Sequence, residues 1–149
     1  MTTASQGVKL VFRCEGCGAM NRVDPSRLAS AKCGRCQQAL RTDGAPQQLS
    51  DADVEALVRS SPVPVLVDFW AEWCAPCRSL GPILEELGKK HAGHLIVAKV
   101  DTEAHQQLAG QLGVQGIPAV FLYRDGKVVD KATGLRPLAA WEAMVAPWI

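Results

Sequence analysis

Three pairs of cysteines with the spacing Cys-x-x-Cys account for all six cysteines of this chain. Two neighbouring pairs can hold a metal ion, whereas a single pair at a strand–helix junction can form and break a disulfide. Two pairs lie near the N-terminus and one stands alone in the middle: Cys14/Cys17, Cys33/Cys36 and Cys74/Cys77. The pattern therefore predicts a small metal-binding module in front of a redox domain.

The length and charge of the chain suit this arrangement. A chain of 149 residues can hold a small module and a domain of about 100 residues. The formal net charge is only +1, which argues against a basic protein that binds nucleic acid or a membrane surface. Residues 1–45 carry 7 basic and 3 acidic side chains, and residues 46–149 carry 9 and 12. We expect neither nucleic acid nor membrane as a partner.

The expected cellular compartment is inferred from the lack of a secretory signal and of a membrane span in the sequence. Residues 1–7 have no positive segment followed by an apolar one, so they do not resemble a secretory signal. No stretch approaches the ~20 apolar residues that cross a bilayer, and the run from Val63 to Trp70 is interrupted by Pro64 and Asp68. We expect a cytoplasmic protein, in which Cys-x-x-Cys pairs serve metal binding or redox chemistry rather than structural disulfides.

The N-terminal pairs have the spacing of a four-thiolate metal site. Fifteen residues separate Cys17 from Cys33, as is typical of zinc modules. Four thiolates without histidine suit one structural zinc ion, although iron fits the same geometry. The ligands would be Cys14, Cys17, Cys33 and Cys36. A module this small cannot build an adequate apolar core, so we expect the metal to hold it folded.

Helices and strands alternate after the module. We place the boundary in a polar segment near residue 45, which gives a module over 1–45 and a second domain over 46–149. A short strand is expected at Val8–Phe12. In the second domain we expect helices at 51–59, 74–90, 102–111 and 137–148, and strands at 63–70, 95–100, 119–123 and 127–131. This order predicts an α/β fold with a mixed central sheet and helices on both faces.

The central pair lies where a strand gives way to a helix, inside Trp73-Cys74-Ala75-Pro76-Cys77. Free backbone N–H groups and the helix dipole stabilise an anion there, so Cys74 is expected to be the attacking thiolate. Cys77 follows about one helical turn later, close enough to form a disulfide with Cys74. Pro76 is tolerated in the first turn and stiffens the loop.

Three residues elsewhere are candidates for assisting the pair. Asp68 lies in an apolar strand, where burial would raise its pKa and make it a proton acceptor for Cys77; an exposed aspartate on an edge strand is the alternative. Lys99 is the candidate partner of Asp68, or else a surface lysine. Pro118 opens a strand, where a cis bond can fix a tight turn.

These motifs, in this order and spacing, resemble thioredoxin. The likeness runs from about residue 48 to residue 149, and with the N-terminal pairs the chain resembles the thioredoxin type that carries an extra zinc module. The residues that carry the likeness are the segment Val67–Arg78, Pro82, the segment Val97–Asp101, the segment Gly116–Pro118, and Gly134.

The resemblance implies a thioredoxin fold and a protein-disulfide reductase. Cys74 would be the nucleophile and Cys77 the resolving thiol, and the bond before Pro118 would be cis and face them. The implied catalytic set is Cys74, Cys77, Asp68, Lys99 and Pro118. The implied apolar surface for substrate consists of Trp73, Ala75, Pro76, Ile117, Pro118 and Gly134.

The resemblance also implies partners: disulfide-containing substrate proteins and an NADPH-dependent thioredoxin reductase. We expect a monomer with no bound organic cofactor. The alternative function is a partner-binding or holdase module that grips proteins through the zinc module and the apolar rim. The presence of both Cys74 and Cys77 argues against that alternative, because a binding module has no need of them.

Two features depart from typical thioredoxins. Ala75 stands where they have glycine, and the residues between the two cysteines tune the reduction potential. The segment Pro46–Leu49 offers little signal for the first strand of the fold. We expect that strand to be short, or to be replaced by contact with the N-terminal module.

Overall fold

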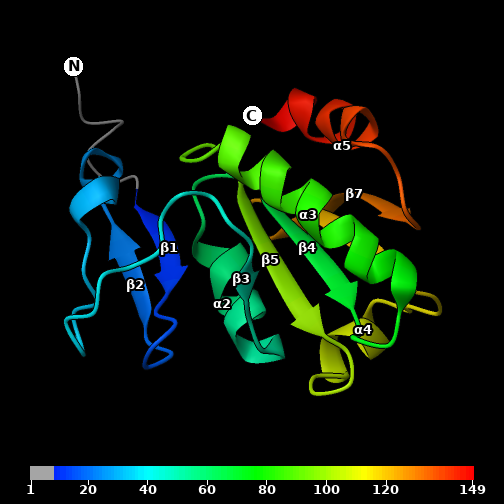
Figure 1. Cartoon of the computed structure of the whole chain (residues 1–149), viewed down its shortest axis with the longest axis horizontal. Helices are drawn as coiled ribbons and strands as arrows, with labels where there is room; N and C mark the ends of the chain where they lie inside the picture. Colours follow the sequence, from blue (N-terminus) through cyan, green and yellow to red (C-terminus); the bar gives the residue numbers. More distant parts are fainter. Residues whose placement is uncertain (1–8) are drawn as a thin grey trace.

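The computed structural model describes residues 9–149, which form a small module packed beside a five-stranded sheet (Figure 1). Residues 1–7, from which we inferred the lack of a secretory signal, lie outside the described residues, as does Val8, the predicted start of a strand. Within the described part, no helix has the length and apolar character needed to cross a membrane.

The module contains a two-stranded antiparallel sheet followed by a short 3-10 helix. Strand β1 (Leu10–Arg13) pairs with β2 (Met20–Val23), and the helix η1 (Pro25–Ser30) follows. Asp24 caps η1, because its carboxylate accepts a hydrogen bond from the N–H of Ser26 at 2.9 Å. The sequence pattern predicts only β1, since β2 and η1 are too short and too polar to show a period.

The second part is built on a mixed sheet with the strand order β3-β5-β4-β6-β7. Neighbouring strands β3, β5 and β4 are parallel, whereas β6 is antiparallel to β4 and β7 is antiparallel to β6. The strands are β3 (Gln47–Gln48), β4 (Val65–Trp70), β5 (Ile96–Asp101), β6 (Ala119–Arg124) and β7 (Lys127–Thr133). The predicted mixed sheet is confirmed.

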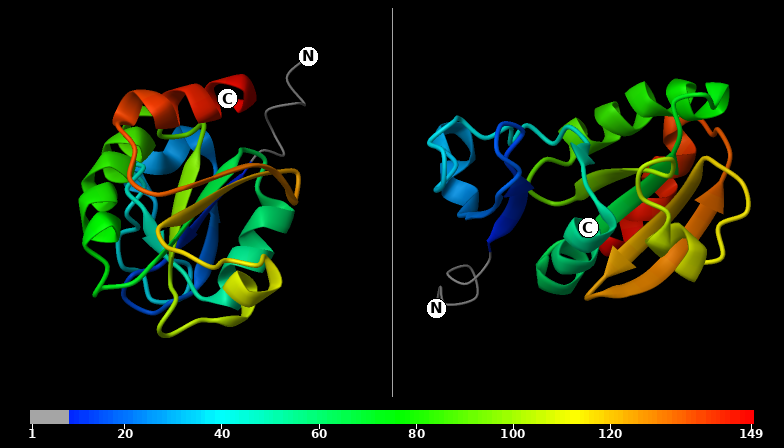
Figure 2. Two further views of the ribbon diagram at one scale, coloured as in Figure 1. Left: turned by 90° about the vertical axis from the view of Figure 1, so that its right-hand side faces the viewer. Right: turned by 90° about the horizontal axis from the view of Figure 1, so that it is seen from below.

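Helices cover both faces of the sheet (Figure 2). On one face lie α3 (Ala75–Lys90) and α5 (Leu138–Val145), the latter continued by η2 (Ala146–Trp148). On the other lie α2 (Asp51–Ser60) and α4 (Gln107–Gln111). Because successive strand residues point to opposite faces, Leu66 of β4 packs under α3, whereas Val65, Val67 and Phe69 pack under α2.

Three helices begin later than the sequence predicts: α3 and α5 by one residue, and α4 by five. α4 begins at Gln107 rather than at 102, because Asp101 holds the preceding residues in a turn: its Oδ1 accepts from Glu103 N at 2.9 Å and its carbonyl accepts from His105 N at 2.8 Å. The carboxylate of Asp51 then accepts from the first backbone N–H groups of α4 at 3.2 Å. Pro137 is the N-cap of α5 rather than its first residue.

The module contacts the edge strand β3 through the side chain of Gln47. Its Oε1 accepts a hydrogen bond from Arg13 N at 2.7 Å, and its Nε2 donates to Val11 O at 3.1 Å. The side-chain amide thus pairs with β1 much as a strand backbone would. Both outcomes left open by the weak signal at Pro46–Leu49 therefore occur: β3 has two residues, and the module contacts it.

The linker between the two parts lies against α3 at a pair of glycines. A Cβ atom at Gly44, whose φ is +95°, would overlap the carbonyl of Gly88, and a Cβ at Gly88 would overlap the carbonyl of Gly44. Val11 of β1 also joins the apolar core under α2. The module is therefore docked and shares core residues with the sheet, while its division from residues 46–149 as a separate domain stays a prediction.

Candidate redox and metal sites

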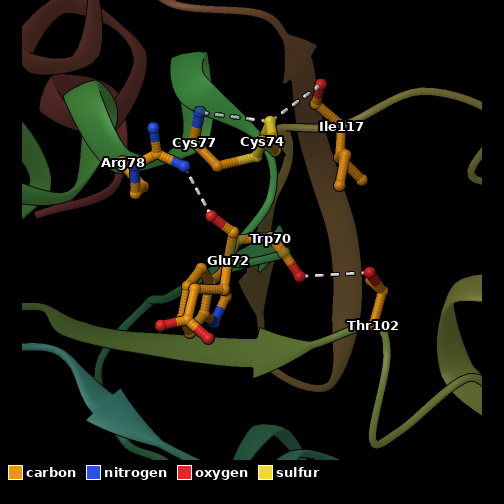
Figure 3. Close-up of a disulfide and its surroundings, with 7 residues drawn as sticks. All are labelled: Trp70, Glu72, Cys74, Cys77, Arg78, Thr102 and Ile117. Carbon is orange, nitrogen blue, oxygen red and sulfur yellow. Dashed lines mark hydrogen bonds between the residues drawn. A yellow bond between two sulfur atoms is a disulfide. The ribbon is translucent and has the colours of Figure 1, made fainter.

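The central cysteine pair forms a disulfide at the start of α3 (Figure 3), with the two Cα atoms 5.2 Å apart. Cys74 is the N-cap of the helix, and its Sγ accepts a hydrogen bond from the N–H of Cys77 at 3.2 Å. Both residues are nearly inaccessible, with Cys74 5% and Cys77 1% exposed. Because the N–H of Cys77 points at Cys74 Sγ and the N-terminus of a helix carries partial positive charge, both would stabilise the Cys74 thiolate once the disulfide is reduced.

Two hydrogen bonds hold the segment between β4 and α3. The guanidinium of Arg78 donates to the carbonyl of Glu72 at 2.6 Å, and the hydroxyl of Thr102 donates to the carbonyl of Trp70 at 3.1 Å (Figure 3). Sequence reasoning missed Thr102 as a residue of the site. It included Arg78 only as the last residue of the segment that resembles thioredoxin, because neither hydrogen bond follows from a local pattern.

The loop before β6 faces the disulfide. The Ile117–Pro118 peptide bond is cis, as the resemblance implies. The carbonyl oxygen of Ile117 lies 3.8 Å from Cys74 Sγ, and the carbonyl of Pro118 accepts from Gly134 N at 2.9 Å. Ile117, which is far from Cys74 in sequence, therefore lies beside it, and Gly134 is bonded to the same loop through Pro118.

The surface around the disulfide is apolar and exposed. Trp73 is 68% exposed, and Ala75 and Pro76 are also exposed. The structure adds Leu135, a large apolar side chain that is 49% exposed directly after Gly134. Sequence reasoning missed it, although an apolar residue in the loop between β7 and α5 is a signal that could have found it.

Asp68 lies in β4, the central strand that leads to the redox pair. It points to the α3 face of the sheet, since Leu66 two residues earlier packs there. Its side chain is fully buried, and neither carboxylate oxygen has a hydrogen-bond partner within the described residues. Burial raises the pKa of Asp68 to about 7, while the charge of Lys99 opposes that rise. The alternative of an exposed aspartate on an edge strand is wrong.

Lys99 lies beside Asp68 in the sheet but does not form an ion pair with it. The two are paired in the parallel register of β4 and β5. Within the described residues, however, no salt bridge joins them, and Lys99 Nζ lies 4.3 Å from the ring centroid of Trp70. Lys99 therefore acts on Asp68 through its charge rather than through contact. Because its amino group lies over the Trp70 ring, Lys99 is not a free surface lysine.

The four N-terminal cysteines converge on one point. Their Sγ atoms all lie within 4.8 Å of one another. Cys14 and Cys36 are 3.6 Å apart at sulfur, and Cys17 and Cys33 are 3.5 Å apart. Tetrahedral zinc with Zn–S bonds of about 2.3 Å requires sulfurs about 3.8 Å apart. The predicted ligand set therefore fits a zinc ion.

The charges of these thiols also suit a divalent cation. The N–H of Cys36 is the main cause that lowers the pKa of Cys33 to about 6, and the N–H of Cys17 lowers the pKa of Cys14. The pKa of Cys36 is raised to about 11, because the other three thiols and burial outweigh the N–H of Gln38, which lowers it. A divalent cation between the four sulfurs would favour the thiolate form of each of them.

Comparison with known proteins gives consistent matches. The family model for thioredoxin matches residues 45–146. Thioredoxin C-3 of Corynebacterium nephridii is 35% identical over 126 residues, which is 84% of this chain and 86% of that protein. Thioredoxin 1 of a Nostoc species is 40% identical over 93 residues, 62% of this chain and 87% of that protein. A solved mutant thioredoxin from Halobacterium salinarum NRC-1 superposes with a TM-score of 0.66 at 29% identity, covering 72% of this chain and 94% of that one.

Proposed function

Because this chain belongs to the thioredoxin family, whose members are thiol-disulfide oxidoreductases, we propose that it reduces disulfides in other proteins through Cys74 and Cys77. The observation that carries the proposal is their disulfide at the N-terminus of α3, next to the loop that carries Ile117 and Pro118. The geometry supplies an activated thiol, a second thiol to resolve the intermediate, and a surface for the substrate chain.

The first step is attack by Cys74. In the reduced protein its thiolate is stabilised by the first-turn N–H groups and lies beside the exposed apolar surface. It forms a bond with one sulfur of the substrate disulfide, and the other substrate sulfur leaves with the electron pair. A mixed disulfide between Cys74 and the substrate results. The Ile117 carbonyl beside Cys74 Sγ is placed to accept a backbone N–H from an extended substrate segment.

The second step releases the substrate. Cys77 loses its proton and attacks Cys74 Sγ, and the substrate thiolate leaves as the Cys74–Cys77 disulfide forms. Cys77 is 1% exposed, so its thiolate gains little from solvent and its proton needs an acceptor. Asp68 is suited to this role, because a carboxylate with a pKa of about 7 can take up a proton near neutral pH.

The exposed apolar side chains around the pair would hold the substrate. Trp73 directly precedes Cys74, and the loop carrying Ile117 lies between the pair and the Gly134 turn, which the exposed Leu135 follows. Apolar contacts are sequence-tolerant, which suits a reductase of many protein disulfides. Recharging of the Cys74–Cys77 disulfide would be performed by an NADPH-dependent thioredoxin reductase, in the cytoplasm.

The module would hold one structural zinc ion through Cys14, Cys17, Cys33 and Cys36. The support is the fit of the four sulfurs to a tetrahedron and the charge that they would carry. When bound, zinc would supply a crosslink between the turns that follow β1 and η1, and so hold the module folded. The alignment with Thioredoxin C-3 spans more residues than 46–149 contains, so it extends into this module. Metal analysis with one zinc per colourless chain supports this assignment, and a ferric-thiolate absorption band overturns it.

Insulin reduction tests the proposed reaction. With an NADPH-linked thioredoxin reductase supplying electrons, the parent protein should turn over, and Cys74→Ser should abolish turnover because the nucleophile is missing. Cys77→Ser should stop at a mixed disulfide that gel electrophoresis and mass measurement detect. Asp130→Asn, at an exposed aspartate of β7, is the control for a substitution outside both cysteine sites. Full turnover by Cys74→Ser would sink the proposal.

Suppression of aggregation distinguishes the holdase alternative. A reductase should lose its effect on disulfide-linked aggregates when both redox cysteines are changed to serine. If that double variant protects a thermally unfolding, cysteine-free client as well as the parent does, the binding function is the better account.

A further inference from the structure

The N-terminal module has a cavity of its own, with a volume of about 400 Å³. It is formed by β2, η1 and the segment that follows η1, and its charged lining residues are Lys9, Arg22, Asp24, Arg27 and Lys32. We call it the basic cavity. The module lies beside the β3 edge of the sheet, whereas the redox pair lies at the start of α3 (Figure 1). The basic cavity is therefore separate from the redox surface.

The charge of the basic cavity is not balanced by the residues around it. Four cations and one carboxylate line it, which gives a net charge of +3 when all are ionised. The carboxylate of Asp24 is already engaged, because it caps η1 and one of its oxygens lies 3.5 Å from Lys9 Nζ. Within the described residues, no salt bridge involves Arg22, Arg27 or Lys32. Three cations therefore line the cavity without a counter-charge.

The backbones that carry these three cations are ordered. Arg22 lies on β2, which is paired with β1. Arg27 lies in η1. Lys32 forms an isolated antiparallel bridge with Ala39 and directly precedes Cys33. Because these segments are held in place before any partner arrives, less conformational entropy is lost when a partner binds.

The lining favours an acidic polypeptide over other anions. The two arginines can each bind a carboxylate through a pair of parallel hydrogen bonds. Small organic ligands are usually held by apolar and aromatic side chains, and nucleobases stack on aromatic rings. Among the described residues that line the cavity, however, only Val23 and Ala31 are apolar and none is aromatic. Three unpaired cations on three separate segments suit several carboxylates spaced along one chain.

We propose that the basic cavity binds an acidic segment of a partner protein, whose aspartate or glutamate carboxylates contact Arg22, Arg27 and Lys32. The interaction is non-covalent and needs no redox step, so it goes beyond the proposed disulfide reduction. A protein held there leaves the surface around Cys74 and Cys77 uncovered. A disulfide in the same protein would then meet the redox pair at a raised effective concentration.

Fluorescence anisotropy measures this binding directly. The oxidised full chain is titrated into a short fluorescein-labelled peptide of glutamate and serine that contains no cysteine, at low ionic strength. The anisotropy should rise with protein concentration, and the affinity should fall as salt is added, because salt screens exposed charges. A peptide with glutamine in place of each glutamate should not bind. Since the peptide has no disulfide, its binding does not depend on the proposed reductase activity, and a failure of insulin reduction would refute only that activity.

Paired substitutions locate the site. The double variant Arg22→Gln/Arg27→Gln should bind the glutamate peptide about tenfold more weakly, and Lys32→Gln, on a different segment, about threefold more weakly. The matched control Arg59→Gln/Lys127→Gln removes two exposed cations of α2 and β7 and should bind within about twofold of the parent. All five positions are exposed, so each variant should melt at the temperature of the parent.

Two results would overturn the proposal from the peptide alone. One is no binding of the glutamate peptide at low ionic strength. The other is an equal loss of affinity in the cavity variants and in the control, which would indicate attraction to the whole protein rather than to the cavity. A labelled single-stranded oligonucleotide with the same number of charges tests the other class of polyanion. If it binds more tightly than the glutamate peptide and loses affinity in the cavity variants, the cavity is a nucleic-acid site and the proposal is wrong.

Discussion

Replacing Asp68 with asparagine should stabilise the protein, and the gain should grow with pH. The carboxylate is fully buried and its oxygens have no hydrogen-bond partner within residues 9–149. The substitution Asp68→Asn keeps the size of the protonated acid and removes the ionisation. The variant therefore isolates the cost of burying this charge.

The size and sign of the effect follow from linkage. The pKa of Asp68 is about 7 in the folded protein, against an ordinary 3.8, because burial disfavours its charge. Between these values the folded state holds a proton that the unfolded state has lost, so stability falls as pH rises from about 3.8 to about 7. The full difference corresponds to about 4 kcal/mol, of which roughly 3 kcal/mol falls between pH 5 and pH 9.

Urea unfolding of the oxidised proteins at a series of pH values provides the measurement. The free energy of unfolding of Asp68→Asn, minus that of the parent, should increase by roughly 3 kcal/mol from pH 5 to pH 9 and level off above pH 7. Asp130→Asn, at an exposed aspartate of β7, should show no such increase. Groups that titrate in the parent and in both variants, including those of the metal site, contribute equally to each free energy of unfolding and cancel when one is subtracted from another. A difference that does not change with pH would refute the assignment of a raised pKa to Asp68.

Three further predictions concern packing and metal. Gly88→Ala should lower the free energy of unfolding by about 1–3 kcal/mol and speed proteolysis of the linker, because its Cβ would overlap the Gly44 carbonyl; Gly110→Ala should not, and equal effects would contradict the close contact. Leu84→Ala should cost about 2–5 kcal/mol in chemical unfolding, since the side chain is fully buried under α3; a loss under about 1 kcal/mol would contradict that packing. Strong chelation should remove the module's circular dichroism and lower the melting temperature of the rest, because Val11 shares its core; an unchanged melting curve would contradict this.

The alternation of helices and strands could be predicted because most elements of the sheet domain are buried on a regular period. The run Val65–Trp70 and the leucines of α3 identify their elements from local sequence alone. The redox pair and the burial of Asp68 were also accessible, since both depend on residues within one strand and the helix that follows it.

What sequence could not show depends on contacts between distant residues. The late start of α4 is set in part by Asp51, which accepts from Gln107 and Leu108 far along the chain. The absence of an ion pair between Asp68 and Lys99 depends on where Lys99 Nζ rests, which is over Trp70. The docking of the module through Gln47 gives no local signal, because a glutamine side chain replaces part of a strand backbone.

The central claim is that Cys74 and Cys77 cycle while the four module cysteines remain a closed metal site. A redox titration, with alkylation and peptide mass measurement at each potential and zinc analysis in parallel, tests it directly. The account predicts that only the peptide carrying Cys74 and Cys77 changes its alkylation, as one two-electron transition, with one zinc per chain throughout. Oxidation of the module peptides with loss of zinc in the same transition, or a Cys74/Cys77 peptide that does not titrate, would contradict it.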